Sequence, residues 1–92
     1  MPAEPRRILL VEDEKSIREA VSAYLEREGY WVTAAPDGAV ALEQFAKSRF
    51  DLVVLDLMLP KVPGEQVCRA IRDVSDVPII MLTAKGELED RV

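Results

Sequence analysis

Apolar positions along the chain fall into blocks with two different spacings. Four short runs have the length of β-strands, and they are dominated by apolar residues with little polar alternation, as is typical of strands buried on both faces. The second of these runs is rich in aromatic and β-branched residues, which strands favour. The four predicted strands are Arg7 to Val11, Tyr30 to Ala35, the stretch "LVVLDLMLP" from Leu52 to Pro60, and Val77 to Leu82.

Between these runs the apolar residues recur every three or four positions, which is the spacing of one helical face. Gly29 stands where a glycine would end the first helix, and "PDG" at Pro36 to Gly38 is a predicted turn. "GELEDRV" at the end of the chain looks like the start of a fourth helix. The predicted inward residues of the three complete helices are Ile17, Ala20, Val21, Tyr24 and Leu25, then Leu42, Phe45 and Ala46, then Val67, Ile71 and Val74 within Gly64 to Val74.

Strands and helices alternate along the whole chain, and this order predicts an α/β fold built from βαβ units with a parallel sheet. With 92 residues there is room for one domain, residues 1–92, and no internal repeat or linker interrupts it. In such sheets ligands bind in the crevice outside the carboxyl ends of the strands. The residues that follow each strand are therefore the first candidates for function.

Carboxylates stand at the ends of the first and third predicted strands. Two of them directly follow Val11, and within the stretch from Leu52 to Pro60 the strand itself is expected to end at Asp56. A hydroxyl follows the fourth strand. These residues are Glu12, Asp13, Asp56 and Thr83. Three clustered carboxylates repel one another unless a cation joins them, and hard oxygen ligands suit Mg²⁺. A carboxylate can also act as nucleophile toward a phosphoryl group, and Thr83 could then donate a hydrogen bond to a phosphate oxygen. Taken singly, Glu12 and Asp13 fit helix caps that complement the dipole of the following helix, Asp56 fits a loop residue, and Thr83 fits an N-cap.

Composition narrows the classes of partner. Seventeen acidic and twelve basic residues give a net charge of -5, and no basic patch is evident in the sequence, so direct binding to nucleic acid is not expected. Cys68 is the single cysteine and fits a small apolar residue in a reduced, cytoplasmic setting. No apolar stretch is long enough for a signal peptide or a membrane span.

The segments "ILLVEDE", "DLVVLDLMLPKVPGEQVCRAIR" and "VPIIMLTAKGELEDRV" resemble the receiver domain of bacterial two-component response regulators, in the group with a winged-helix DNA-binding output. The resemblance covers essentially the whole chain. It implies a flavodoxin-like three-layer sandwich, phosphorylation by a sensor histidine kinase, and transcription regulation by an output domain that lies outside these residues. It also implies that the domain is not a turnover enzyme. The implied roles are the phosphoacceptor Asp56, Mg²⁺ ligands Glu12, Asp13, Asp56 and the carbonyl of Met58, the switch hydroxyl of Thr83, and the phosphate-facing amide of Ala84.

The chain departs from the family pattern after the fourth strand. Receivers carry a lysine at the end of a fifth strand and then a last helix, whereas this sequence stops at Val92, and neither Lys61 nor Lys85 follows a fifth strand. Phosphorylation is therefore expected to be slow. Loss of the last helix is expected to expose apolar residues of strands three and four and to leave strand four as a bare edge, so that the chain forms a homo-oligomer.

Three functions from other classes are alternatives to a phosphoacceptor domain. A structural fragment that folds and self-associates without signalling is distinguished by its failure to take up a phosphoryl mimic at Asp56. A phosphatase with an aspartyl nucleophile would want a second acid two residues later, where Met58 stands. A dinucleotide-binding domain would need a glycine-rich turn after the first strand, and this sequence has none.

Overall fold

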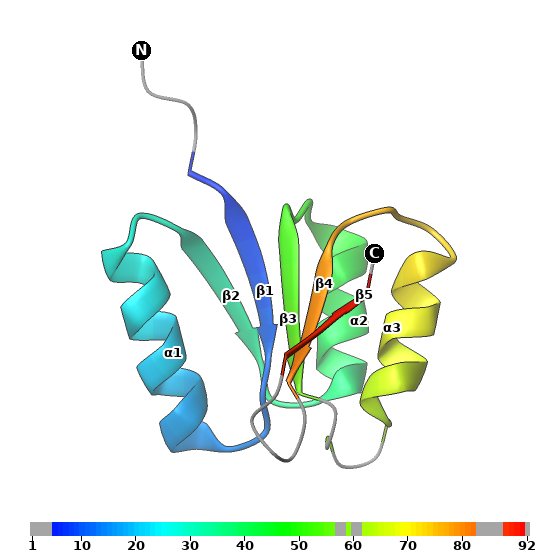
Figure 1. The fold of residues 1–92 in the computed structure, drawn as a ribbon, viewed down its shortest axis with the longest axis horizontal. Helices are drawn as coiled ribbons and strands as arrows, with labels where there is room; N and C mark the ends of the chain where they lie inside the picture. Colours follow the sequence, from blue (N-terminus) through cyan, green and yellow to red (C-terminus); the bar gives the residue numbers. More distant parts are fainter. Residues whose placement is uncertain (1–4, 57–58, 60–61, 83–87, 92) are drawn as a thin grey trace.

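The structure, a computed structural model, describes residues 5–56, 59, 62–82 and 88–91. Strands and helices alternate as predicted up to the fourth strand (Figure 1). The strands are β1 (Arg7–Val11), β2 (Trp31–Ala35), β3 (Leu52–Asp56), β4 (Ile79–Leu82) and β5 (Leu88–Arg91). The helices are α1 (Lys15–Arg27), α2 (Gly38–Lys47) and α3 (Gly64–Arg72).

The strands form one sheet in the order β2-β1-β3-β4-β5. The first four are parallel, and β5 pairs antiparallel with β4. Helix α1 packs on β1 and β2 from one side of the sheet, whereas α2 and α3 lie together on the other side (Figure 1). The predicted three-layer α/β fold with a parallel, flavodoxin-like sheet is confirmed.

The core lies between the sheet and the α2–α3 layer. Alternate side chains of β1, β3 and β4 point into this layer and are fully buried, because successive strand residues face opposite sides of a sheet. Val67 and Ile71 of α3 are buried against them, and the free thiol of Cys68 packs at the margin as a small apolar group. The sheet residues of this core are Leu9, Val11, Val53, Leu55, Ile79 and Met81.

The predicted turns are confirmed at both ends of the β2 region. Gly29 has φ 98°, a left-handed conformation that glycine adopts readily, and the chain reverses there after α1. The amide of Tyr30 donates to the carbonyl of Leu25 at 3.1 Å, which closes the end of the helix. Asp37 then caps α2, since its carboxylate accepts a hydrogen bond from the amide of Val40 at 2.9 Å.

Several residues predicted to face inward are instead exposed. In α1 no residue is fully buried, and Ile17 and Tyr24 are 45% and 55% exposed. Among the described residues the helix packs mainly on β1 and β2, so only part of its wide apolar stripe finds a partner, through the half-buried Val21 and Leu25. The remaining exposed positions are Ala20, Ala46 and Val74, of which Val74 follows the end of α3.

The prediction of a helix at Gly86 to Val92 is wrong for Leu88–Arg91, which form β5. The same strand corrects the expectation of a bare edge at β4, because β5 pairs with all four residues of β4 from Ile79 to Leu82. An edge strand offers a row of unpaired backbone groups. A segment of four residues is too short to form a stable helix by itself, so pairing with that row is the more favourable arrangement.

The α1 side of the sheet is only partly covered. Ile8 and Leu10 of β1 are buried there, whereas the corresponding side chains of β3 and β4 are half-exposed. We call the latter the open face, and it consists of Leu52, Val54, Ile80 and Leu82. The prediction that apolar residues of strands three and four are exposed is thus confirmed, since these side chains are partly exposed. Among the described residues no helix is long and apolar enough to cross a membrane.

Gly38, the first residue of α2, lies close to α3 and to the segment that leads into it. A Cβ atom at this position would lie 2.6 Å from a methyl group of Val67 and 2.9 Å from Cβ of Val62. We expect Gly38→Ala to lower the free energy of unfolding by roughly 1 to 3 kcal/mol through overpacking, partly offset by the ~1 kcal/mol helix preference of alanine. Urea denaturation measures the change.

The matched control for Gly38→Ala is Ala39→Gly at the next, exposed position of the same helix. It tests helix propensity alone and is expected to cost about 1 kcal/mol or less. A Gly38→Ala variant as stable as the unaltered protein would contradict the close approach of α2 to Val62 and Val67.

Candidate functional site

Three acidic side chains meet at the carboxyl ends of β1 and β3. Glu12 and Asp13 directly follow β1, and Asp56 is the last residue of β3. Each offers a carboxylate oxygen, and these oxygens all lie within 4.8 Å of one another. Asp56 therefore lies at the rim of the sheet, half-buried, rather than inside the buried strand, which explains how a carboxylate can follow so apolar a run.

Glu12 is the most enclosed of the three residues, with 7% of its surface exposed. Its carboxylate accepts a hydrogen bond from the amide of Glu14 at 3.0 Å, and its own amide donates to the carbonyl of Ala35 at 3.0 Å. Burial raises the pKa of Glu12 above its ordinary value, the Glu14 amide opposes this, and the nearby charges of Asp56 and Asp13 add to the rise. The site thus holds negative charge that a bound cation would relieve.

Arg18 fixes the loop between β1 and α1, a role that the sequence reasoning missed. Its guanidinium donates to the backbone carbonyl of Glu12 at 2.9 Å and to that of Asp13 at 3.2 Å. The side chain comes from the first turns of α1 and reaches back across the loop. An arginine five or six residues after an acidic pair is the only sequence signal for this contact, and that spacing is too common to be informative alone.

The remaining predicted site residues lie outside the described residues. These are Met58, Thr83 and Ala84. The register of the sheet pairs Asp56 with Leu82, the last residue of β4, so the carboxyl ends of β3 and β4 lie side by side. The roles assigned to the three residues stay predictions.

The donor set fits a hard divalent cation. Three carboxylates supply oxygen ligands only, and two of them, Asp13 and Asp56, are accessible enough for bound water to complete the coordination. Mg²⁺ usually binds through one or two carboxylates and keeps several waters. The geometry therefore suits Mg²⁺ better than metals that prefer sulfur or imidazole, which none of the three side chains offers.

The raised pKa of Glu12 predicts a pH dependence of stability without metal. The folded state retains the Glu12 proton at pH values where the unfolded chain has lost it, so this contribution to stability is full below the unfolded pKa of 4.5. It is lost as the pH rises through the folded pKa. We expect the difference in free energy of unfolding between the unaltered protein and Glu12→Gln to grow in favour of the variant from pH 4.5 to neutral pH.

Urea denaturation in a metal chelator measures this difference, because the comparison cancels the other titrating groups. Glu14→Gln, at an exposed neighbouring position, serves as the control for loss of one negative charge on this loop. A constant difference between Glu12→Gln and the unaltered protein across the pH range would contradict the assignment.

The family model described as Response regulator receiver domain matches residues 8–92. The chain is 49% identical over 90 residues to the transcriptional regulatory protein CseB of Streptomyces coelicolor, which covers 98% of this chain and 38% of CseB. It is 48% identical over 86 residues to the transcriptional regulatory protein ResD of Bacillus subtilis, covering 94% of this chain and 36% of ResD. The chain thus spans less than half of these relatives.

Solved structures show the same fold. The response regulator TrrA of Thermotoga maritima, in complex with Mg²⁺ and beryllofluoride, matches with a TM-score of 0.81 and 42% identity, covering 86% of this chain and 70% of TrrA. TrrA in complex with the histidine kinase ThkA matches with a TM-score of 0.82 and 41% identity, covering 89% of this chain and 72% of the matched chain. The chemotaxis protein CheY4 of Vibrio cholerae matches with a TM-score of 0.85 and 37% identity, covering 90% of this chain and 72% of CheY4.

Proposed function

The chain belongs to the family of response regulator receiver domains, and from this membership we propose that Asp56 accepts a phosphoryl group with the help of Mg²⁺ held by Glu12, Asp13 and Asp56. Receiver domains of this family are phosphoacceptors in two-component signal transduction. One observation carries the proposal for this chain: three carboxylates from two different strand ends bring their oxygens within 4.8 Å of one another.

The chemistry assigned to Asp56 is attack of a carboxylate oxygen on phosphorus. A new O–P bond forms, the bond from phosphorus to the donor breaks, and the product is an acyl phosphate on Asp56. When Mg²⁺ is bound, it neutralises charge on the phosphoryl oxygens. Glu12 and Asp13 hold the cation beside Asp56, and Arg18 keeps the loop that carries them in place through two backbone carbonyls. In the proposed role the domain takes part in transfer but is not a turnover enzyme.

The proposed donor is a sensor histidine kinase, and the proposed output is transcription. The similarity to TrrA, solved in complex with the kinase ThkA, supports the first, and the relatives CseB and ResD, named transcriptional regulatory proteins, support the second. A cytoplasmic setting belongs to the same proposal, since Cys68 is a buried free thiol. The backbone carbonyl of Met58, the hydroxyl of Thr83 and the amide of Ala84 are proposed to complete the metal and phosphate contacts.

Titration with beryllofluoride and Mg²⁺, followed by NMR, tests the proposal. Mg²⁺ alone should shift the amides next to its ligands, and we expect beryllofluoride to add a further, saturable set of shifts around Asp56 only when Mg²⁺ is present. The same titration with Asp51→Asn, at the opposite end of β3, should give the same shifts. If the protein folds and binds Mg²⁺ but shows no response to beryllofluoride, the alternative of a structural fragment that does not signal is correct.

We also propose that copies of the chain associate through the open face. Leu52, Val54, Ile80 and Leu82 are half-exposed there, and Ile17 and Tyr24 of α1 are exposed apolar groups. Because β5 already pairs with β4, edge pairing at β4 is not the expected route. Sedimentation equilibrium is expected to show a homodimer or higher oligomer that Ile80→Thr shifts toward monomer. A folded, monodisperse monomer at high micromolar concentration would contradict this expectation.

A further inference from the structure

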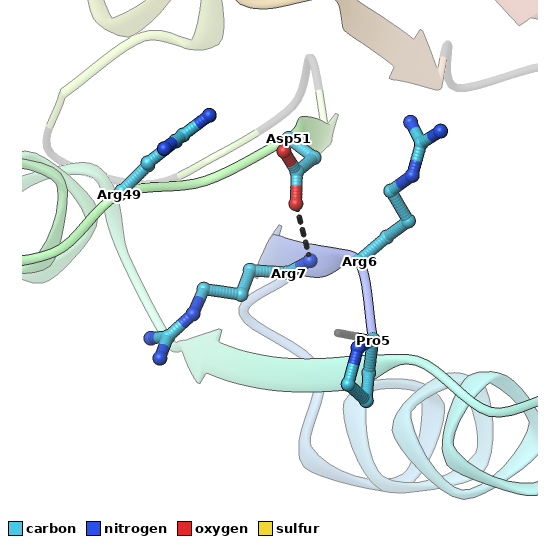
Figure 2. A pocket seen from close by; sticks show the side chains of 5 residues that line it. All are labelled: Pro5, Arg6, Arg7, Arg49 and Asp51. Atoms are coloured by element: carbon cyan, nitrogen blue, oxygen red, sulfur yellow. Dashed lines mark hydrogen bonds between the residues drawn. The ribbon is translucent and has the colours of Figure 1, made fainter. Parts of the chain in front are cut away.

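The amino ends of β1 and β3 bring together three arginines, of which Arg49 is far in sequence from the adjacent Arg6 and Arg7. Arg6 and Arg7 lead into β1, and Arg49 lies just before β3, at the end of the sheet opposite to the acidic site. Parallel neighbouring strands begin at the same edge of a sheet, so these residues meet there. Together with Asp51 and Pro5 they line a hollow of about 210 Å³ (Figure 2). We call this hollow the arginine pocket.

Asp51 holds the pocket together without neutralising it. Its carboxylate accepts a hydrogen bond from the backbone amide of Arg7 at 2.8 Å, and its own amide donates to the Arg7 carbonyl at 2.7 Å. These two bonds fix Asp51 against the first residue of β1. Three arginines and one aspartate leave a formal charge of +2 at this edge, in a chain whose net charge is -5.

The three guanidinium groups are not equivalent. That of Arg7 lies over the Trp31 ring, 4.9 Å from its centroid, and is held there by a cation–π contact. Arg6 and Arg49 extend on either side of Asp51, away from the direction taken by Arg7 (Figure 2). Among the described residues no hydrogen bond or ion pair engages the guanidinium group of either one. Two fork-shaped cationic donors are thus available at one small hollow.

A second hollow of about 410 Å³ shares Arg6 and Asp51 with the arginine pocket. It is otherwise lined by Ile8, Tyr30 and Leu52, which are apolar or aromatic. Guanidinium groups match phosphate and carboxylate oxygens through paired hydrogen bonds. A ligand with a phosphate or carboxylate group and a small apolar part could therefore place its anionic group near Arg6 and Arg49. Its apolar part could then lie beside Tyr30.

We propose that the arginine pocket is a binding site for a small organic anion, with a phosphate or carboxylate group held at its mouth by Arg6 and Arg49, which flank the carboxylate of Asp51, and an apolar or aromatic part against Tyr30. The site is separate from the acidic cluster and does not depend on the function proposed for it. Both arginines are exposed, so salt screens the interaction and inorganic phosphate alone is expected to bind with a dissociation constant of roughly 1 mM.

Titrations at constant ionic strength test the proposal, with inorganic phosphate, phenyl phosphate and benzoate as probes. Trp31 is a built-in reporter, because its ring lies under Arg7 and its amide donates to the carbonyl of Arg6 at 2.9 Å. We expect a saturable change in Trp31 fluorescence, with phenyl phosphate binding several-fold more tightly than inorganic phosphate. Whichever of phenyl phosphate and benzoate binds more tightly shows whether the pocket prefers a phosphate or a carboxylate group.

Arg49→Gln is expected to weaken binding about tenfold, which corresponds to ~1.4 kcal/mol. Arg6→Gln should act similarly, whereas Arg69→Gln, an exposed arginine on α3, should leave binding unchanged. Circular dichroism confirms that each variant folds. Lack of a saturable response to all three probes overturns the proposal. Equal weakening in Arg69→Gln and Arg49→Gln also overturns it, because the anion is then adventitious and senses only net charge.

Discussion

Exchange of Asp56 for asparagine is expected to abolish uptake of a phosphoryl group from acetyl phosphate. Asparagine keeps the size and shape of the side chain but lacks the anionic oxygen that would attack phosphorus. Asp56 ends β3 at the rim of the sheet, within reach of the carboxylates of Glu12 and Asp13. Incubation with acetyl phosphate and Mg²⁺, followed by intact mass measurement, should show one added phosphoryl group on the unaltered chain and none on Asp56→Asn.

The control for this experiment is Asp51→Asn, which removes the same charge from the other end of the same strand. Asparagine at position 51 can still accept the hydrogen bond from the amide of Arg7, so the fold should be kept. Labelling of Asp51→Asn should match that of the unaltered chain. Labelling that persists in Asp56→Asn would show that another side chain is the acceptor.

The buried strands could be predicted closely because their sequence signal is strong and local. Arg7–Val11 and the start of β3 at Leu52 were placed as observed, since an apolar run between polar residues leaves few alternatives. The acidic trio followed from the topology: residues after β1 and β3 must meet at one edge of a parallel sheet. For this reason the sequence predicts that Glu12, Asp13 and Asp56 lie close together in space, although Asp56 is far from the other two in sequence.

The elements that depend on what packs beside them could not be predicted in the same way. The apolar stripe of α1 indicates a helix that buries one face, but it does not determine how much of that face packs against other elements. The pattern predicts Ile17 and Tyr24 inside, but both are exposed, because among the described residues α1 packs mainly on β1 and β2. The segment Leu88–Arg91 is too short to fix its own structure, and pairing with β4 decides it.

The arginine pocket shows a different limit of sequence reasoning. Arg6 and Arg7 are adjacent in the chain, but Arg49 joins them only through the β1–β3 register, in which Ile8 pairs with Leu52. A search for runs of basic residues therefore finds no patch in this acidic chain. The backbone carbonyl contacts of Arg18 were missed for a related reason, since they depend on the path of a loop and not on a motif.

Replacement of Asp13 by alanine is expected to weaken Mg²⁺ binding at least tenfold. Asp13 is exposed, whereas Glu12 is buried and Asp56 half-buried, so its loss removes an oxygen ligand and a charge at little cost to the fold. The remaining pair of carboxylates still attracts a cation but no longer surrounds it. Glu14→Gln removes the same charge one residue later, from a side chain outside the cluster, and is expected to leave the affinity nearly unchanged.

Two measurements check this expectation. Trp31 is a poor reporter for Mg²⁺, because it begins β2 and the acidic cluster lies beyond the other end of that strand, where the amide of Glu12 meets Ala35. NMR shifts of amides near Val11 and Ala35 should follow the titration instead. Urea denaturation gives a second readout, since Mg²⁺ at a hundred times its dissociation constant should stabilise the folded chain by about 2.7 kcal/mol. At the same concentration Asp13→Ala should gain about half of that or less, and equal gains would rule out Asp13 as a ligand.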